Sequence, residues 1–117
     1  MKLVADFLVG LIAVLHVWIL VLEMFLWTKP FGLKTFGQSR EAAEASKVLA
    51  ANQGLYNGFL AAGLAWGLIS GDGAVKLFFV ACVLVAGIYG GLTAKRSILY
   101  VQALPALLAL IVLLASR

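Results

Sequence analysis

The sequence predicts an all-α polytopic membrane protein whose four transmembrane helices form a bundle. Of its 117 residues, 64% are hydrophobic and only 12% are charged, which is more apolar surface than one small water-soluble core can bury. The chain also contains four apolar stretches of roughly 20 residues, the length that a helix needs to cross a bilayer. We therefore expect a single membrane domain over residues 1–117, with helices at about 3–28, 40–70, 74–94 and 97–116.

The first helix is interrupted only by two ionisable residues, His16 and Glu23. Its apolar run is about twice as long as the roughly 7 to 15 residues of a signal-peptide core, so we expect it to be retained. The two residues are seven positions apart, close to two helical turns, and therefore share one face. Ionisable side chains at membrane depth are costly and mark functional sites by default.

The segment before the second helix contains Pro30, Gly32 and Gly37, which favour a loop. The run that begins at Arg40 is rich in alanine and glutamate and favours a helix. We therefore expect the second helix to begin at about residue 40, before the membrane, with Ser39 as its N-cap.

The second helix carries a polar face beside a smooth face. The polar face holds four side chains within an arc of about 140°, and these are Asn52, Gln53, Tyr56 and Asn57. Small residues at four-residue spacing allow another backbone to approach closely, and the pairs with this spacing include Gly54 with Gly58 and, in the third helix, Gly87 with Gly91. The glycine faces predict close helix packing, either within one chain or in a homo-oligomer of several copies.

The third and fourth helices form a hairpin, because only the short Lys95–Arg96 break separates them. The third helix follows a tight turn at Gly71–Gly73. Pro105 lacks a backbone N–H and is expected to strain the fourth helix. Each helix brings one polar side chain to roughly 7 to 8 Å below the same membrane surface, and these side chains are Glu23, Gln53, Tyr89 and Gln102.

The basic residues predict the orientation in the membrane. Six of them fall on one side, namely Lys29, Lys34, Arg40, Lys47, Lys95 and Arg96, and three fall on the other, namely Lys2, Lys76 and Arg117. The positive-inside rule then places both termini outside the cytoplasm in a multi-pass protein of the cell membrane. The basic residues form no dense or aromatic-interleaved stripe, so we expect the lipid bilayer and not nucleic acid as the partner.

No residue pattern predicts a metal or cofactor. His16 and Glu23 lie about 10 Å apart along their helix, too far for both to ligate one ion, and no second histidine exists. The single cysteine, Cys82, excludes an internal disulfide and a CxxC redox pair. We expect neither a metal site nor a bound cofactor.

Two functions from different classes fit this pattern. The first is a membrane protein that binds or moves a small amphipathic or polar solute in an intramembrane pocket. The second is an intramembrane enzyme that acts on a lipophilic substrate with Glu23 as general acid or base. An accessory subunit of a larger assembly is a third possibility. The expected ligand-binding residues are His16, Glu23, Asn52, Gln53, Asn57, Tyr89 and Gln102.

Two strings of residues carry a family resemblance. The first is E-M-x-x-W-x-x-P from Glu23 to Pro30, and the second is N-Q-G-x-Y-N from Asn52 to Asn57. The chain resembles the small four-helix bacterial membrane proteins known as domain of unknown function 1304, which implies the four-helix fold but no activity. It is also similar in outline to membrane-associated glutathione and eicosanoid enzymes. Their Arg-Ala-x-x-Asn-x-x-Glu pattern would need charged residues at Val48 and Leu55, so glutathione chemistry is not carried over.

Overall fold

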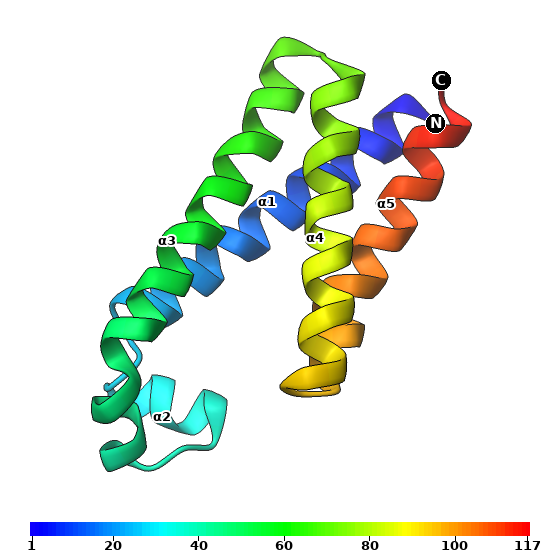
Figure 1. Cartoon of the computed structure of the whole chain (residues 1–117). Helices are drawn as coiled ribbons and strands as arrows, with labels where there is room; N and C mark the ends of the chain where they lie inside the picture. The colour runs from blue at the N-terminus through cyan, green and yellow to red at the C-terminus, as the bar shows by residue number, and fades with distance from the viewer. The chain divides into compact units, whose positions relative to one another are not determined.

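A computed structural model describes all 117 residues, and every regular element in it is helical (Figure 1). The predicted all-α class is therefore confirmed. The chain forms two compact units, one made of Met1–Val14 with Leu60–Arg117 and the other of Leu15–Phe59. The boundaries between them fall inside helix α1 (Lys2–Met24) and helix α3 (Arg40–Ser70).

The core of the first unit lies among the start of α1, the end of α3, and the helices that follow. Helix α4 (Gly73–Thr93) packs along η1 (Leu99–Ala103) and α5 (Leu104–Ala115), which lie beside it in Figure 1. Small and β-branched side chains dominate this core, so the helices approach closely. Its buried residues are Ala5, Val9, Ile12, Leu64, Val80, Val83, Ala106, Ala109 and Leu113.

The predicted turn between α3 and α4 is confirmed in atomic detail. Gly71 has a φ of 68°, a left-handed conformation that glycine adopts without a steric penalty. Asp72 is the N-cap of α4, where its Oδ1 accepts hydrogen bonds from the backbone N–H groups of Ala74 at 2.9 Å and Val75 at 3.3 Å. These contacts explain why α4 begins within one residue of the predicted position.

The fourth predicted helix is not a uniform α-helix. The sequence had predicted strain at Pro105, and the structure departs from α-helical geometry just before it. The first part of this helix, η1, is a π-helical turn in which the Leu104 N–H bonds to the Leu99 carbonyl five residues earlier. Pro105 follows directly, and because the backbone stays helical from η1 into α5, its missing N–H leaves one carbonyl of the π-helical turn without this donor. The widened turn thus takes up the strain that Pro105 was expected to cause.

In the second unit, α1 ends at Met24 and not near residue 28, and the predicted loop contains a further helix, α2 (Pro30–Phe36). Lys29 is extended, as expected for a residue before proline, with φ −84° and ψ 157°. Pro30 then starts α2 at the position where proline is best tolerated. Proline and glycine therefore set the ends of a short helix here, where the sequence had predicted an irregular loop.

The end of α2 has the geometry of a Schellman motif. Gly37 has a φ of 63°, its N–H bonds to the Lys34 carbonyl at 3.3 Å, and the Gln38 N–H bonds to the Leu33 carbonyl at 3.1 Å. Gly32 is needed for another reason, since a Cβ at this position would overlap the Leu26 carbonyl. The chain therefore folds back tightly after α1.

Trp27 ties this corner to the next helix. Its Nε1 donates to the Ser46 hydroxyl at 3.2 Å, and its ring packs on Phe36 with the ring centroids 4.9 Å apart. The Ser46 hydroxyl in turn donates to the Ala42 carbonyl at 2.9 Å. Trp27 thereby connects the chain after α1, helix α2 and the first turns of α3.

Helix α3 begins at Arg40, as predicted, and Ser39 caps it. The Ser39 Oγ accepts a hydrogen bond from the Ala42 N–H at 3.1 Å, which satisfies one of the four backbone donors left over at a helix start. One turn later Glu44 and Lys47 form an exposed ion pair at 3.0 Å.

We expect Ser39→Ala to destabilise the start of α3 by about 1 kcal/mol, because it removes this acceptor. Amide hydrogen exchange should show faster exchange at Ala42 and its neighbours. Ser39→Asp, which keeps an acceptor at the same place, should exchange like the wild type. Equal exchange in Ser39→Ala and the wild type would contradict the capping role.

Candidate functional site

The second unit brings two of the predicted site residues into direct contact. Asn57 of α3 donates from its Nδ2 to the Glu23 Oε1 in the last turn of α1, at 2.7 Å. The same Nδ2 donates to the backbone carbonyl of Gln53 at 3.0 Å. Both partners are acceptors, so the amide orientation follows from its contacts, and both of its N–H groups are engaged. Glu23 and Asn57 are each half-buried.

Two glycines of α3 create the room for this contact. A Cβ at Gly54 would lie 2.6 Å from the Met24 Cγ and 3.2 Å from the Glu23 Cβ, and one at Gly58 would lie 2.7 Å from the Leu20 Cδ1. Such distances are shorter than ordinary van der Waals contact. A side chain at position 54 would push α3 away from α1, whereas one at position 58 would displace only the end of the Leu20 side chain. The glycine face of α3 therefore packs within the chain.

The contact leaves two hydrogen-bond acceptors without a partner in the chain. The Glu23 carboxylate uses Oε1 for Asn57, and its Oε2 makes no further hydrogen bond. The Asn57 amide uses Nδ2, and its Oδ1 makes none. An ionised carboxylate is acceptor-only, and an amide oxygen has two lone pairs. The contact can therefore accept further hydrogen bonds.

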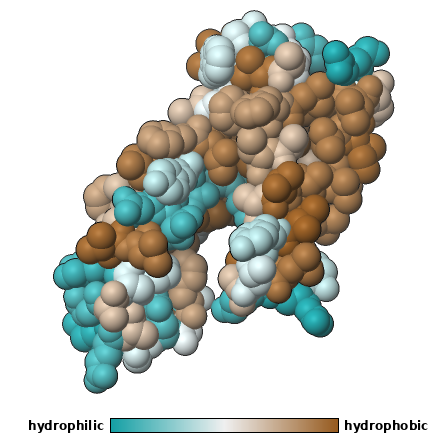
Figure 2. Space-filling view, viewed as in Figure 1, coloured by the Kyte–Doolittle hydropathy of each residue, from teal (hydrophilic) through white to brown (hydrophobic).

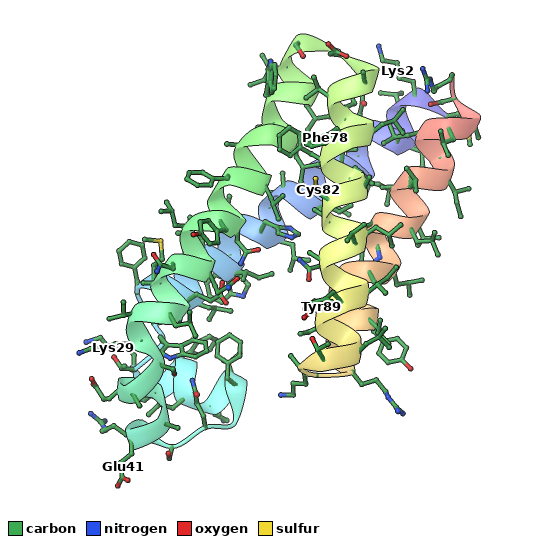
Figure 3. The ribbon with its side chains drawn as sticks, viewed as in Figure 1. Lys2, Lys29, Glu41, Phe78, Cys82 and Tyr89 are labelled. Atoms are coloured by element: carbon green, nitrogen blue, oxygen red, sulfur yellow. The ribbon has the colours of Figure 1, made fainter.

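The other predicted site residues lie in different surroundings. In the second unit His16 is fully buried, whereas Asn52 and Gln53 are exposed. In the first unit Tyr89 is exposed on α4 (Figure 3), and Gln102 is half-buried in the π-helical turn. The convergence of these side chains on one pocket stays a prediction.

The glycine pair of α4 also packs within the chain. A Cβ at Gly87 would lie 2.7 Å from the backbone nitrogen of Ala103, and a Cβ at Gly91 would overlap the Leu99 side chain. Ala103 and Leu99 both belong to η1. At these two helix pairs the glycines thus allow close packing inside one chain. A homo-oligomer formed through the same faces stays a prediction.

Groups of three or more His, Cys, Asp or Glu side chains that could hold a metal ion are absent. Cys82 is a half-buried free thiol on α4 (Figure 3).

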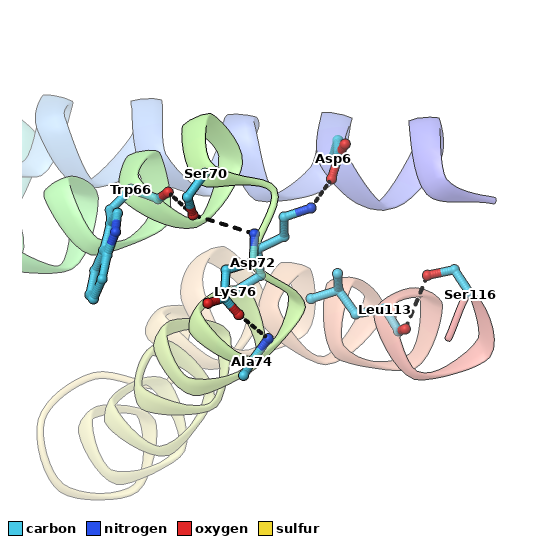
Figure 4. A network of polar contacts seen from close by, with 8 residues as sticks. All are labelled: Asp6, Trp66, Ser70, Asp72, Ala74, Lys76, Leu113 and Ser116. Carbon is cyan, nitrogen blue, oxygen red and sulfur yellow. Dashed lines mark hydrogen bonds and ion pairs between the residues drawn. The ribbon is translucent and has the colours of Figure 1, made fainter.

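One charged pair was not predicted from the sequence. Lys76, which was predicted only as one of the basic residues on one side of the membrane, is 4% exposed, and its Nζ contacts the Asp6 Oδ1 at 2.8 Å (Figure 4). The two residues are 70 positions apart, so no local pattern connects them. Each of them stands just before an apolar stretch, and these matching positions are the signal from which the pair could have been predicted.

The chain matches a family model described as "Protein of unknown function (DUF1304)" over residues 10–114. It belongs to this family. It is similar to "Uncharacterized protein YpaA" of Lactococcus lactis subsp. lactis (strain IL1403), with 34% identity over 106 residues that cover 86% of this chain and 88% of that protein. No solved structure matches the chain.

The two strings that predicted membership in the DUF1304 family meet at the Glu23–Asn57 contact. Glu23 opens the first string and Asn57 closes the second, and Gly54 of the second string permits the close approach. Trp27 and Pro30 of the first string build the adjoining corner with α2. The residues that carry the resemblance to the DUF1304 family therefore lie together in one part of the second unit.

Proposed function

We propose that this protein spans the cell membrane four times. Two helices, α1 and α4, are long and apolar enough to cross a bilayer, and only 22% of the apolar window of each is buried. The core helix of a water-soluble protein would be mostly buried. The large exposed share therefore favours lipid as the surroundings of these helices.

The surface of the first unit supports the same proposal. Figure 2 shows apolar side chains over α5 and over much of α4. On α4, Phe78 is 64% exposed and Leu92 is 75% exposed. Charged residues flank this band, with Asp72 before α4 and Lys95–Arg96 after it. An apolar band between charged ends is typical of a membrane-spanning hairpin.

The remaining two crossings are assigned to α3 and to the η1–α5 helix. The apolar helix Leu99–Ala115 is shorter than α1 and α4, and α3 carries Asn52 and Asn57 in its apolar part. One cavity is lined by Lys2 of α1, by Gly71 between α3 and α4, by Gly73 at the start of α4, and by Arg117 after α5. Helix ends that meet in this way support an even number of crossings, and the positive-inside rule then assigns both termini to the outside.

We infer that the protein binds or moves a small polar or amphipathic solute that donates hydrogen bonds at the Glu23–Asn57 contact. The observation that carries this inference is the pair of unengaged acceptors, Glu23 Oε2 and Asn57 Oδ1, on helices with apolar neighbours. A carboxylate in such surroundings is costly unless a partner compensates its charge. A cationic or hydroxylated solute supplies that partner.

The test is Glu23→Gln. Glutamine keeps an oxygen that can accept from Asn57, so the helix contact is preserved, but an NH₂ replaces the unengaged Oε2 and the charge is lost. Native mass spectrometry of the gently extracted protein should show a bound small molecule in the wild type and at least about tenfold less of it in the variant, a change of roughly 1.4 kcal/mol. Proton-coupled flux into reconstituted vesicles should fall in parallel.

Glu41→Gln is the matched control, because it makes the same substitution at an exposed residue of α3 that forms no ion pair. Identical ligand content in wild type and Glu23→Gln would contradict the role of Glu23. A chemically altered lipid that depends on Glu23 would instead identify the protein as an enzyme, with Glu23 as general acid or base.

A further inference from the structure

A cavity of about 150 Å³ lies in the first unit, where the start of α1, the start of α4 and the end of α5 meet. Figure 4 shows several of the residues around it. Its polar lining consists of Lys2, Asp6, Lys76, Ser116 and Arg117, and the remaining lining residues are Ala5, Gly71, Gly73, Leu77 and Leu113. The cavity is separate from the Glu23–Asn57 contact, which lies wholly in the second unit.

The three basic residues of this cavity are all the basic residues that the sequence places on the less basic side of the membrane. The positive-inside rule sets six basic residues against three, and those three are Lys2, Lys76 and Arg117. The structure brings all three to one cavity, although they come from distant parts of the chain. The positive-inside rule disfavours basic residues on the outer side of the membrane. Three of them at one cavity there indicate that their charge has a local role.

The charges at the cavity do not cancel. Asp6 is the one acidic side chain there, and it pairs with Lys76, which leaves Lys2 and Arg117 uncompensated by any ion pair. The Lys76 ammonium has three N–H donors and gives one to Asp6. Its side chain is only 5% exposed, so the other two donors have little access to bulk water and need acceptors nearby.

The size and lining of the cavity limit what it can hold. A volume of 150 Å³ is below the roughly 300 to 1,000 Å³ of pockets for drug-sized ligands, and matches about five water molecules or one small anion. Leu77 and Leu113 make one part of the lining apolar. A compact oxyanion with an apolar attachment fits both parts.

We propose that this cavity binds a phosphate group, supplied by an anionic phospholipid or by free phosphate. The Arg117 guanidinium and the Lys2 ammonium give charge-assisted hydrogen bonds to the phosphate oxygens, and Lys76 offers its two remaining donors from within. In the lipid case, Leu77 and Leu113 contact the glycerol and the start of the acyl chains.

The test compares two phospholipids with the same acyl chains, phosphatidylglycerol and phosphatidylcholine, on the full chain in mild detergent by native mass spectrometry. We expect phosphatidylglycerol to be retained in preference, and the double variant Lys2→Gln/Arg117→Gln to weaken its binding about tenfold. Both side chains are exposed, so the fold should persist, and circular dichroism checks this.

The matched control is Lys95→Gln/Arg96→Gln, which removes the same charge at the opposite end of α4 and should change binding less than twofold. Equal weakening by both double variants, or equal retention of the two lipids, would overturn the proposal. Inorganic phosphate distinguishes the two sources in the wild type. Displacement of the lipid by millimolar phosphate shows that the free anion is sufficient, and persistence of the lipid identifies the phospholipid as the occupant.

Discussion

Asp6→Asn is expected to lower the free energy of unfolding by about 3 kcal/mol. The Lys76 side chain is 5% exposed, and Asp6 is its one ion-pair partner, at 2.8 Å. Removing the carboxylate charge leaves a buried ammonium uncompensated, which is the costly way to break such a pair. Asp6 is itself 32% exposed, so the expected loss lies at the lower end of the range for buried pairs.

The measurement is reversible unfolding by sodium dodecyl sulfate in mild detergent, followed by circular dichroism. The double variant Asp6→Asn/Lys76→Met should recover most of the loss, because it also removes the buried charge and leaves an apolar side chain of similar length. A double-mutant cycle then gives the coupling energy of the pair.

The chain offers a matched control in the pair formed by Glu44 and Lys47. These side chains are 48% and 58% exposed and lie one helical turn apart, so Glu44→Gln should cost no more than about 0.5 kcal/mol. If Asp6→Asn and Glu44→Gln lowered the free energy of unfolding by the same amount, the burial of Lys76 would have no energetic consequence. That result would contradict the prediction.

Helix α3 was predictable because its signals are local. Ser39 supplies the cap, the alanine-rich run after Arg40 favours a helix, and Gly71 ends it in a left-handed conformation. Each signal acts within a few residues of the boundary that it sets. The structure accordingly has α3 at Arg40–Ser70, the range expected from the sequence.

The end of α1 was not predictable from hydropathy. Residues 25–28 are mostly apolar and continue the pattern of α1, but the chain turns because Lys29 is extended before Pro30 and because Gly32 lets the chain approach Leu26. Apolar character favours burial in lipid or protein equally, so it cannot distinguish a helix from a packed turn. The position of Trp27 over Phe36 fills the same corner with apolar side chains.

The candidate site was predictable in part. Glu23 and Asn57 were expected to be functional because polar side chains are rare in apolar helices, and the structure joins them. Their contact depends on the approach of α1 and α3 at Gly54, which a pattern of small residues indicates without naming the partner. The Asp6–Lys76 pair depends on tertiary structure alone, since 70 positions separate the two residues.

Gly87→Ala is expected to destabilise the protein by about 2 kcal/mol, although alanine is the better helix former. The added Cβ would lie 2.7 Å from the nitrogen and 2.9 Å from the Cα of Ala103, so α4 and the π-helical turn would have to separate. Gly73→Ala makes the same change at the start of α4, where nothing lies within 4 Å. It should change stability by no more than about 0.5 kcal/mol. The same unfolding titration measures both variants, and equal effects would contradict the packing of α4 on η1.

A second substitution separates a backbone clash from a side-chain clash. Gly63→Ala meets the ring of Phe79, so Phe79→Leu should restore much of the stability that Gly63→Ala loses. Ala103→Gly should not rescue Gly87→Ala in this way, because two of the three atoms nearest the new Cβ belong to the backbone of residue 103 and remain there. A large coupling energy for Gly63 with Phe79, and almost none for Gly87 with Ala103, is the expected pair of results. Rescue of Gly87→Ala by Ala103→Gly would mean that the π-helical turn can shift, and that its approach to α4 is set by side chains instead of by the backbone.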